Sequence, residues 1–210
     1  YKEQNKPKGL PDAFILGKNF IKNDKIAMIL GDNFFYGQSL TKMLMECVKI
    51  KDGAKVILHK VVNPENFGVA VLKEKKIVKI KEKPKKFLSD LAITGLYFFD
   101  NKVVEYAKKL KPSKRNELEI VDLLNQYRMK NTLSAELIGR GGAWLDTGSI
   151  EDFYKTSNFV SAIENQQGFK IACLEEISLS NGWINKKDIK KSIKFYGNCN
   201  YSKYLKKIIS

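Results

Sequence analysis

The stretch that decides the fold is Ile26-Ala27-Met28-Ile29-Leu30-Gly31-Asp32-Asn33. Its first five residues are all apolar, which is typical of a strand buried on both faces in a parallel sheet. The strand pattern stops at Gly31, so the Asp32 carboxylate lies where the chain turns. Ligands of open α/β sheets bind beyond the carboxyl ends of the strands. Asp32 is therefore expected either to meet a magnesium ion that carries phosphates or to cap the turn or the next helix.

Outward from this strand, apolar segments with strand and helix periodicity alternate along the chain. The exception is a pair of alternating segments, 67–72 and 77–83, which predicts an antiparallel hairpin ended by Pro84. We predict an α/β fold with a mixed, mostly parallel, Rossmann-like central sheet flanked by helices, with an inserted β-hairpin and C-terminal helices. Further strands are expected at 54–62, 92–100 and 132–138, and helices from residue 12 and at 40–48, 103–110, 117–130 and 150–165, then two short basic helices around Gly182 and Gly197.

The charge of the chain bears on its partners. It carries 38 Lys and Arg against 23 Asp and Glu, a formal net charge of +15. Only Arg115, Arg128 and Arg140 are arginines, the residue that base readout and bidentate phosphate readout favour. Because the lysines are spread along the chain, we expect a solvated basic surface that helps attract anionic substrates, and no nucleic-acid partner.

Cysteine usage and hydropathy bear on the compartment. Cys47, Cys173 and Cys199 are far apart and lack a CxxC spacing, so they fit neither a disulfide framework nor a zinc site, and a cytoplasmic location is expected. No apolar run reaches membrane-spanning length and no signal peptide is visible, so no membrane partner is expected. The chain opens at Tyr1 in a polar stretch, which we interpret as an interior point of a longer protein.

Two carboxylates stand at the ends of apolar segments bounded by glycine. One is Asp32, and the other is Asp146, in Trp144-Leu145-Asp146-Thr147-Gly148. Brought together over the sheet, two such groups can share one magnesium ion, which bridges phosphate oxygens and neutralises developing charge. The pair forms a candidate metal site.

Glu82-Lys83-Pro84 forms a further candidate site. Proline stops ladder pairing and fixes the chain, so the side chains before it are held at a sheet edge. Lys83 can hold a phosphate there and Glu82 can accept sugar hydroxyls, or both belong to a solvated charge run. Gly68 either lets a ligand approach the backbone or relieves a strand start. Arg115 lies just before a helix N-terminus, a natural anion site, or is an ordinary surface arginine.

Motifs of covalent catalysis are absent from the sequence. It has no Ser/His/Asp or Cys/His set, no HExxH, and no Gly-x-Gly-x-x-Gly or Walker loop. The single histidine, His59, falls in a strand pattern and is given no role. A reaction run by positioning and metal charge is therefore favoured.

Seven motifs follow one another along the chain. They are Tyr1–Gln4 with Pro7–Leu10, Leu30–Gly37, Asn63–Val69, Glu82–Pro84, Ile93–Asp100, Leu110–Ser113 with Arg115–Ile120, and Gly139–Gly141 with Ala143–Gly148. In this order they resemble the motifs of the sugar-phosphate nucleotidylyltransferases, most closely the branch that transfers a thymidylyl group to glucose-1-phosphate, and the resemblance extends over essentially the whole chain. It implies the nucleotide-diphospho-sugar transferase fold, with residues 1–165 as the C-terminal part of the nucleotidyltransferase domain and 166–210 as its helical extension.

The resemblance implies a reaction and a cofactor. A phosphate oxygen of glucose-1-phosphate attacks the α-phosphorus of dTTP in line, which gives dTDP-glucose and pyrophosphate in the first step of dTDP-rhamnose synthesis. Mg²⁺ is the implied cofactor, with Asp32 and Asp146 as its ligands.

The resemblance also implies substrate contacts. Lys83 contacts the sugar phosphate with help from Arg115. The implied enzyme is a homotetramer with an effector site, for example for a dTDP-sugar, to which Tyr36 and Gly37 contribute. The positions that hold glucose are Gly68, Glu82 and Tyr97, and those that read and pack against thymine are Gln4, Gly9 and Leu10.

The chain departs from the family pattern in three places. The N-terminal glycine-rich signature, which clamps the triphosphate and begins the first strand, is absent, so we expect this segment alone to be inactive and its sheet to lack a strand. Gln38 stands where histidine is common and Ile150 where a polar residue is common. Both positions fall near interfaces or effector contacts, so regulation is less securely implied than the chemistry.

Three alternatives stay open at this point. The first is uridylyl transfer, because thymine and uracil differ by one methyl group, worth about 1–3 kcal/mol in a pocket. The second is a non-catalytic module that binds a nucleotide sugar. The third is an electrostatic nucleic-acid binder, whose affinity would collapse with salt.

Overall fold

The computed structural model describes all residues from Tyr1 to Ser210. The chain folds into two compact units, Tyr1–Gly148 and Ser149–Ser210, and each has a hydrophobic core of its own. The sequence-based division between residues 165 and 166 concerns the family's domain and stays a prediction. None of the helices has the length and apolar character needed to cross a membrane.

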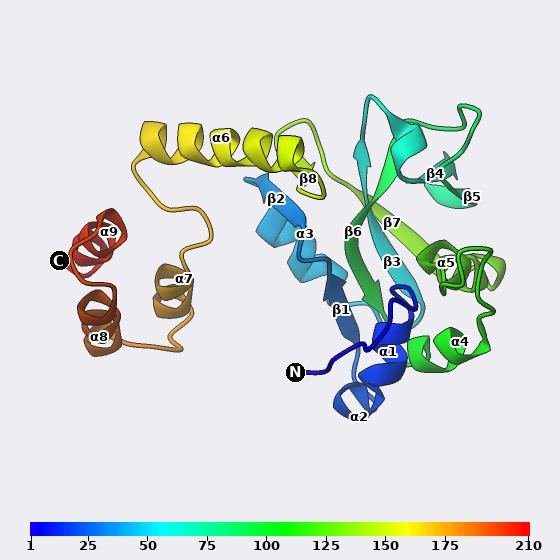
Figure 1. Cartoon of the computed structure of the whole chain (residues 1–210), viewed down its shortest axis with the longest axis horizontal. Coiled ribbons are helices and arrows are strands. Elements are labelled where there is room, and N and C mark those ends of the chain that lie inside the picture. The colour runs from blue at the N-terminus through cyan, green and yellow to red at the C-terminus, as the bar shows by residue number, and fades with distance from the viewer. The chain divides into compact units, whose positions relative to one another are not determined.

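The first unit is built on a six-stranded sheet with the order β5-β4-β6-β3-β7, and β1 also pairs with β6 (Figure 1). One edge of β6 is paired with β3, and the other is shared by β4 and β1. β1, β3, β4 and β7 run in one direction and β6 runs against them, so β3 and β7 form the only parallel pair. The strands are β1 (Ile26–Ile29), β3 (Ala54–Lys60), β4 (Gly68–Lys73), β5 (Lys76–Glu82), β6 (Leu91–Phe99) and β7 (Leu133–Leu137).

These pairings confirm the predicted α/β class, with its inserted hairpin and flanking helices. The expectation that the sheet is mostly parallel is corrected, because neighbouring strands are mostly antiparallel. The apolar pattern of β6 identifies a buried strand but carries no information on its direction. Because β6 runs opposite to its neighbours β1, β3 and β4, each of its three pairings is antiparallel.

Helices cover both faces of this sheet. Along β6, alternate side chains enter different clusters, as the two-residue period of a strand requires. Tyr97 and Phe99 pack in the cluster that includes α1, α2, α4 and α5, whereas Leu96 and Phe98 pack in the cluster that includes α3. The helices are α1 (Asp12–Leu16), α2 (Lys18–Ile21), α3 (Leu40–Cys47), α4 (Val103–Lys109) and α5 (Ile120–Met129), with a short 3₁₀ helix, η1 (Pro64–Asn66), before β4.

β1 differs from the expectation of a strand buried on both faces. Its side chains alternate between half-buried and exposed, and Ile29 is 59% exposed. Ile26 and Met28 pack against the core, while Ala27 and Ile29 lie on the uncovered face. The expectation was wrong because an uninterrupted apolar run does not reveal whether another layer covers its second face.

A two-stranded antiparallel ribbon, β2 (Asn33–Gly37) with β8 (Gly142–Asp146), was not predicted as a strand pair. Its ladder joins the segment that follows β1 to the segment that contains Asp146. Gly37 and Gly142 are paired, and a Cβ atom on Gly37 would lie 2.9 Å from the Cα atom of Gly142. The two glycines thus permit the close approach of the strands at this end of the ribbon.

The second unit is entirely helical. Three helices follow the long first one, rather than the two basic helices expected, because α7 forms before Gly182 and begins with acidic residues. Buried Cys173, Ile189 and Leu205 form its core. An Asn185 capping box starts the third helix. The helices are α6 (Ile150–Gln167), α7 (Leu174–Ser180), α8 (Lys186–Tyr196) and α9 (Asn200–Ile209).

Candidate active site

A cavity of about 220 Å³ in the first unit is lined by residues of β4, β5, β6, β8 and α5. Most of its wall is apolar, and a few polar groups converge on it, as is usual for a small-molecule site. The fold thus brings together residues from well-separated motifs. Of the predicted site residues, the cavity collects Leu10, Gly68, Glu82, Lys83, Tyr97 and Asp146.

Asp32 and Asp146 approach each other beside this cavity. Residue 146 is paired with Asn33, the neighbour of Asp32, at the end of the β2–β8 ribbon. A Cβ atom on Gly148 would lie 3.1 Å from Oδ1 of Asp146 and 3.9 Å from Oδ2 of Asp32. The Gly148 amide also donates a hydrogen bond to Asp146 Oδ1, with an N–O distance of 3.0 Å. Both carboxylates therefore flank the space left by the missing side chain of Gly148.

The chemistry of these donors fits a divalent ion. No group of three or more His, Cys, Asp or Glu side chains lies together in the structure, so an all-protein metal cage is absent. Mg²⁺ is commonly held by one or two carboxylates, with water and substrate phosphates completing its octahedral shell. The oxygen atoms of Asp32 and Asp146 supply that donor set.

Glu82 lies at the end of β5, where its carboxylate meets the start of β4. A Cβ atom on Gly68 would lie 2.9 Å from Glu82 Oε2, so the glycine leaves room for this carboxylate. Burial raises the pKa of Glu82, the Lys83 charge lowers it, and the Glu119 charge raises it further. Burial also raises the pKa of Tyr97, with the Glu82 charge as the second cause. A ligand that donates hydrogen bonds to the Glu82 carboxylate would therefore stabilise its charged form.

Lys83 is exposed and has a φ angle of 39°, in the left-handed region that is costly for a side chain with a Cβ atom. Its amide donates a hydrogen bond to the carbonyl oxygen of Phe67, with an N–O distance of 3.0 Å, and the following Pro84 is buried. The bond and the proline hold the unusual conformation. The Lys83 side chain is thereby presented at the rim of the cavity.

Arg115 does not line the cavity. Its guanidinium donates to both carboxylate oxygens of Glu119, at 3.0 and 2.8 Å from Nη2, and the Ser113 hydroxyl donates to the same carboxylate at 2.6 Å. Hydrogen bonding to Glu119 and its charge raise the pKa of Arg115. A role at the sugar phosphate would require the ion pair of exposed Arg115 with half-buried Glu119 to open or reorient.

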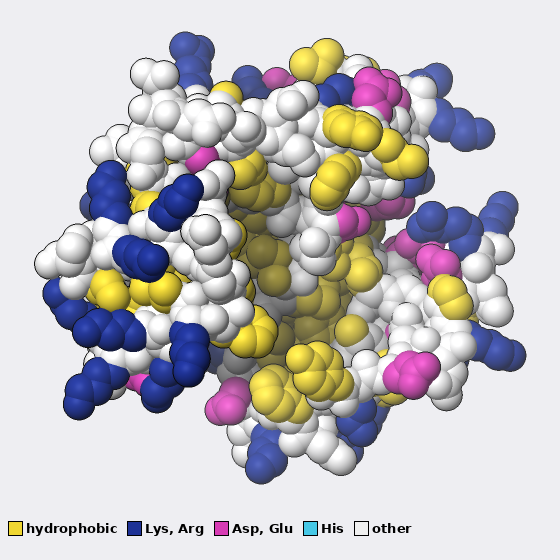
Figure 2. All heavy atoms as spheres, turned by 60° about the vertical axis from the view of Figure 1, so that its left-hand side comes forward, with side chains coloured by type: hydrophobic (Ala, Val, Ile, Leu, Met, Phe, Trp, Pro, Cys, Tyr) yellow, Lys and Arg dark blue, Asp and Glu magenta, His cyan; other side chains and the backbone are white.

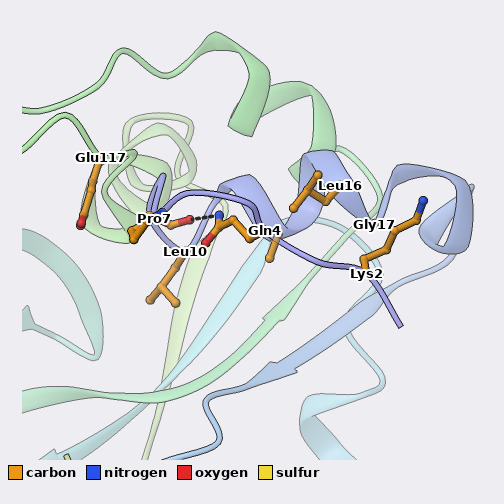
Figure 3. A pocket seen from close by; sticks show the side chains of 9 residues that line it. Lys2, Gln4, Pro7, Leu10, Leu16, Gly17 and Glu117 are labelled. Atoms are coloured by element: carbon orange, nitrogen blue, oxygen red, sulfur yellow. Dashed lines mark hydrogen bonds between the residues drawn. The ribbon is translucent and has the colours of Figure 1, made fainter.

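Gln4 and Gly9 line a second cavity of about 430 Å³ (Figure 3). Leu10 lines both this cavity and the first one. The Gln4 amide donates to Asp12 Oδ2 at 2.7 Å and to the Gly9 carbonyl at 3.5 Å. Gly9 has a φ angle of 90°, and a Cβ atom there would lie 2.0 Å from the carbonyl oxygen of Leu118. Only glycine fits at this crossing of the chain.

The predicted effector residues lie elsewhere on the same ribbon as the carboxylates. Tyr36 is paired with Ala143, and Gly37 with Gly142. Neither residue lines the two cavities. Their effector role stays a prediction.

Asn33 and Trp144 are among the lining residues to which the sequence analysis gave no role. Both were quoted within motifs but given no role, although Asn33 stands next to a predicted metal ligand. The Trp144 indole donates from Nε1 to Asn33 Oδ1 at 2.6 Å. The adjacency of Asn33 to Asp32 was the available signal, whereas the contact with Trp144 depends on the unpredicted ribbon.

The basic surface matches the expected distribution of lysines. On the face shown in Figure 2, Lys and Arg side chains project at many separate points, among apolar and acidic side chains. Several lysines form local ion pairs, such as Lys55 with Glu136 at 3.1 Å and Lys60 with Asp90 at 3.2 Å.

Comparison with known proteins identifies the class to which this site belongs. The family model described as nucleotidyl transferase matches residues 1–163. The chain therefore belongs to the nucleotidyl transferase family, whose members use a divalent metal ion.

Within that family, several curated relatives are glucose-1-phosphate thymidylyltransferases. The protein from Neisseria meningitidis is 45% identical over 210 residues, which is all of this chain and 73% of that protein. The protein from Neisseria gonorrhoeae is 47% identical with the same coverage. The protein from Xanthomonas campestris is 40% identical over 206 residues, or 98% of this chain and 70% of that protein. This chain thus groups with the thymidylyl-transferring members.

Solved structures give the same fold. A crystal structure described as a glucose-1-phosphate thymidylyltransferase from Bacillus anthracis is 40% identical with a TM-score of 0.69, over 76% of this chain and 63% of that chain. A UDP-glucose pyrophosphorylase complexed with UDP-glucose is 28% identical with a TM-score of 0.66, over 75% of this chain and 64% of that chain. This chain therefore spans about three quarters of the Neisseria proteins and less than two thirds of these two crystallised chains.

Proposed function

We propose that this protein transfers the thymidylyl group of dTTP to glucose-1-phosphate, releasing pyrophosphate and forming dTDP-glucose, the first step of dTDP-rhamnose synthesis. The observation that carries this proposal is the convergence of Asp146, Glu82 and Lys83 on one cavity, with Asp32 at its edge. A pair of carboxylates for a metal ion, a lysine for a phosphate and a half-buried carboxylate that accepts hydrogen bonds from hydroxyls are the groups that this reaction needs.

The chemistry proceeds by positioning rather than by a covalent intermediate. Lys83 holds the phosphate of glucose-1-phosphate as a point charge at the rim, and Glu82 accepts hydrogen bonds from sugar hydroxyls deeper in the cavity. Gly68 lets the sugar approach the backbone, while Tyr97 forms part of the cavity wall. These contacts set one phosphate oxygen of the sugar for in-line attack on the α-phosphorus of dTTP.

Asp32 and Asp146 would hold Mg²⁺. A bound ion of this kind neutralises charge on the phosphate oxygens as it develops. The two carboxylates flank Gly148, where no side chain fills the space between them.

The nucleotide base is assigned to the neighbouring cavity. Gln4 supplies an amide, and Gly9 and Leu10 supply a surface against which thymine packs. Because Leu10 lines both cavities, base and sugar lie on either side of one residue. Arg115 assists at the sugar phosphate after exchanging its Glu119 partner for the phosphate.

Two alternatives to thymidylyl transfer differ from it in what the chain does with nucleotides. A uridylyltransferase of the same family is favoured by the likeness to UDP-glucose pyrophosphorylase, but at 28% identity that likeness is weaker than the 45–47% to the Neisseria thymidylyltransferases. A non-catalytic fragment would bind dTDP-glucose without turnover. We further propose a cytoplasmic homotetramer whose dTDP-sugar effector site includes Tyr36 and Gly37.

Because this segment alone is expected to be inactive, the decisive experiment uses the full-length protein. It measures pyrophosphate release with dTTP, glucose-1-phosphate and Mg²⁺, each also left out in turn, and with UTP in place of dTTP. Release that needs all three components and is faster with dTTP supports the proposal. Faster release with UTP would assign the chain to uridylyl transfer. Binding of dTDP-glucose without release would make it a binding module.

A further inference from the structure

The Asn33 side chain joins three parts of the first unit at the edge of the active-site cavity. Its Oδ1 atom accepts hydrogen bonds from the Gly95 amide of β6, at 2.9 Å, and from the Trp144 indole of β8, at 2.6 Å. Its Nδ2 atom donates to Oδ1 of the adjacent Asp32, at 2.8 Å.

We propose that Asn33 is a positioning residue that fixes the Asp32 carboxylate for metal binding. This inference rests on the proposed function, because it takes Asp32 to be a metal ligand. It assigns a task to a side chain that belongs to neither the predicted carboxylate pair nor the predicted sugar contacts.

The orientation of the amide follows from its partners. A backbone N–H and an indole N–H are both obligate donors, so only the carbonyl oxygen of Asn33 can face them. The NH₂ group must then point the other way, toward Asp32. An aspartate at this position would present a second carboxylate to Asp32 instead of a donor.

The orientation of the Asp32 carboxylate follows in turn. Asn33 engages Oδ1, while Oδ2 is the atom that lies 3.9 Å from a Cβ position on Gly148, the side where Asp146 also approaches. One oxygen is therefore held by the protein and the other is directed to the proposed metal. Outer partners of this kind fix the geometry of ligating carboxylates, and their loss typically lowers metal affinity about 10–100-fold.

Gly95 makes this arrangement possible. A Cβ atom at position 95 would lie 2.6 Å from both Cγ and Oδ1 of Asn33 and 2.8 Å from its Nδ2. The whole amide would be displaced by a single methyl group. Gly95→Ala therefore displaces the Asn33 side chain while Asn33, Asp32 and Asp146 themselves remain unsubstituted.

The test is titration of the full chain with Mn²⁺ alone, with free Mn²⁺ followed by electron paramagnetic resonance. We expect Asn33→Ala and Gly95→Ala to raise the Mn²⁺ dissociation constant about tenfold or more. Trp144→Phe, which removes only one of the two donors to Oδ1, should produce a smaller rise. Exposed Asn165→Ala and Trp183→Phe in the second unit serve as matched controls and should leave the constant unchanged.

Asp32→Asn separates failure of this inference from failure of the metal site. If Asp32→Asn abolishes Mn²⁺ binding while Asn33→Ala and Gly95→Ala bind as the parent chain does, the positioning role is overturned and the metal site stands. If the parent chain binds no Mn²⁺, or Asp32→Asn binds it equally well, both are overturned. Melting curves of each variant supply the readout for folding, and loss of affinity must occur in chains that remain folded at the titration temperature.

Discussion

Thr147 is bonded twice to the backbone carbonyl of Asp32. Its amide donates with an N–O distance of 2.7 Å, and its hydroxyl donates with an O–O distance of 2.9 Å. The chain immediately after Asp146 is thereby tied to the residue that carries the other carboxylate. The spacing of the two proposed metal ligands is fixed by the backbone as well as by the β2–β8 ladder.

Removing either carboxylate charge should disable the reaction. We expect Asp32→Asn and Asp146→Asn, each made in the full-length protein, to lower kcat/KM for pyrophosphate release by about 10²–10³-fold, because charge stabilisation at the phosphates is lost. Asp24→Asn, an exposed position before β1, is the control and should retain parental activity. An unaltered Mg²⁺ dependence in both site variants would contradict the assignment.

Two substitutions at Lys83 separate the effect of its charge on binding from the effect of its backbone conformation on stability. Lys83→Gly and Lys83→Ala both remove the ammonium, so each should weaken glucose-1-phosphate binding about tenfold or more. Because φ is 39° at this position, the glycine variant should be more stable than the alanine variant by about 1 kcal/mol. Calorimetric titration and thermal melting measure the two effects, with exposed Lys81→Ala as control. Equal stability of Gly and Ala variants would show that the conformation carries no strain.

Glu82 should make stability depend on pH. Burial places the pKa of Glu82 in the folded state above the ordinary value of 4.5. At a pH between these two pKa values, the folded state keeps a proton that the unfolded state has released. Stability should therefore fall as pH rises from about 4.5 through the raised pKa. Glu82→Gln removes this penalty and should melt above the parent at pH 7, with the gain vanishing below pH 4.5. Exposed Glu74→Gln is the control, and a gain that does not change with pH would refute the explanation.

A buried polar cluster around Asp100, the residue after β6, should contribute to stability. The Tyr127 hydroxyl, on a side chain only 1% exposed, donates to Asp100 Oδ1 at 2.8 Å, and the Gly53 amide donates to Asp100 Oδ2 at 2.7 Å. We expect Tyr127→Phe to lower the free energy of unfolding by about 1–3 kcal/mol, because a buried carboxylate loses a donor.

Urea unfolding followed by tryptophan fluorescence measures this loss. A Trp183→Phe background leaves Trp144 as the only tryptophan, so the signal reports on the first unit. Tyr106→Phe is the matched control, since it removes a hydrogen bond from Lys130 at 2.7 Å and leaves the lysine over the ring. An equal loss in both variants would argue against a special contribution from the Asp100 cluster.

Local patterns predicted most elements of the first unit. The apolar runs of β3 and β6, the alternation of β4 and β5, and the helical spacing of α3 and α4 each identify an element from its own residues. The β2–β8 ribbon could not be identified in this way, because what makes these segments strands is their pairing across the chain. Strand directions and the uncovered face of β1 likewise depend on tertiary neighbours.

The placement of the predicted site residues could be anticipated in part, while their roles stay predictions. Glu82 and Lys83, expected at a sheet edge, and Asp146, expected at the end of an apolar segment, line one cavity. Arg115 does not line this cavity, and its guanidinium instead pairs with Glu119, four residues further along the chain. Asn33 was overlooked because its importance derives from β6 and β8, neither of which is near it in sequence.

The β2–β8 ribbon also determines when the site forms. Asn33 and Trp144 are 111 positions apart, so their pairing must overcome the closure entropy of a long loop. During synthesis, Asp32 leaves the ribosome long before Asp146 has been translated. A nascent chain therefore presents only one of the two proposed metal-binding carboxylates, and we expect the proposed metal site to be completed near the end of folding of the first unit.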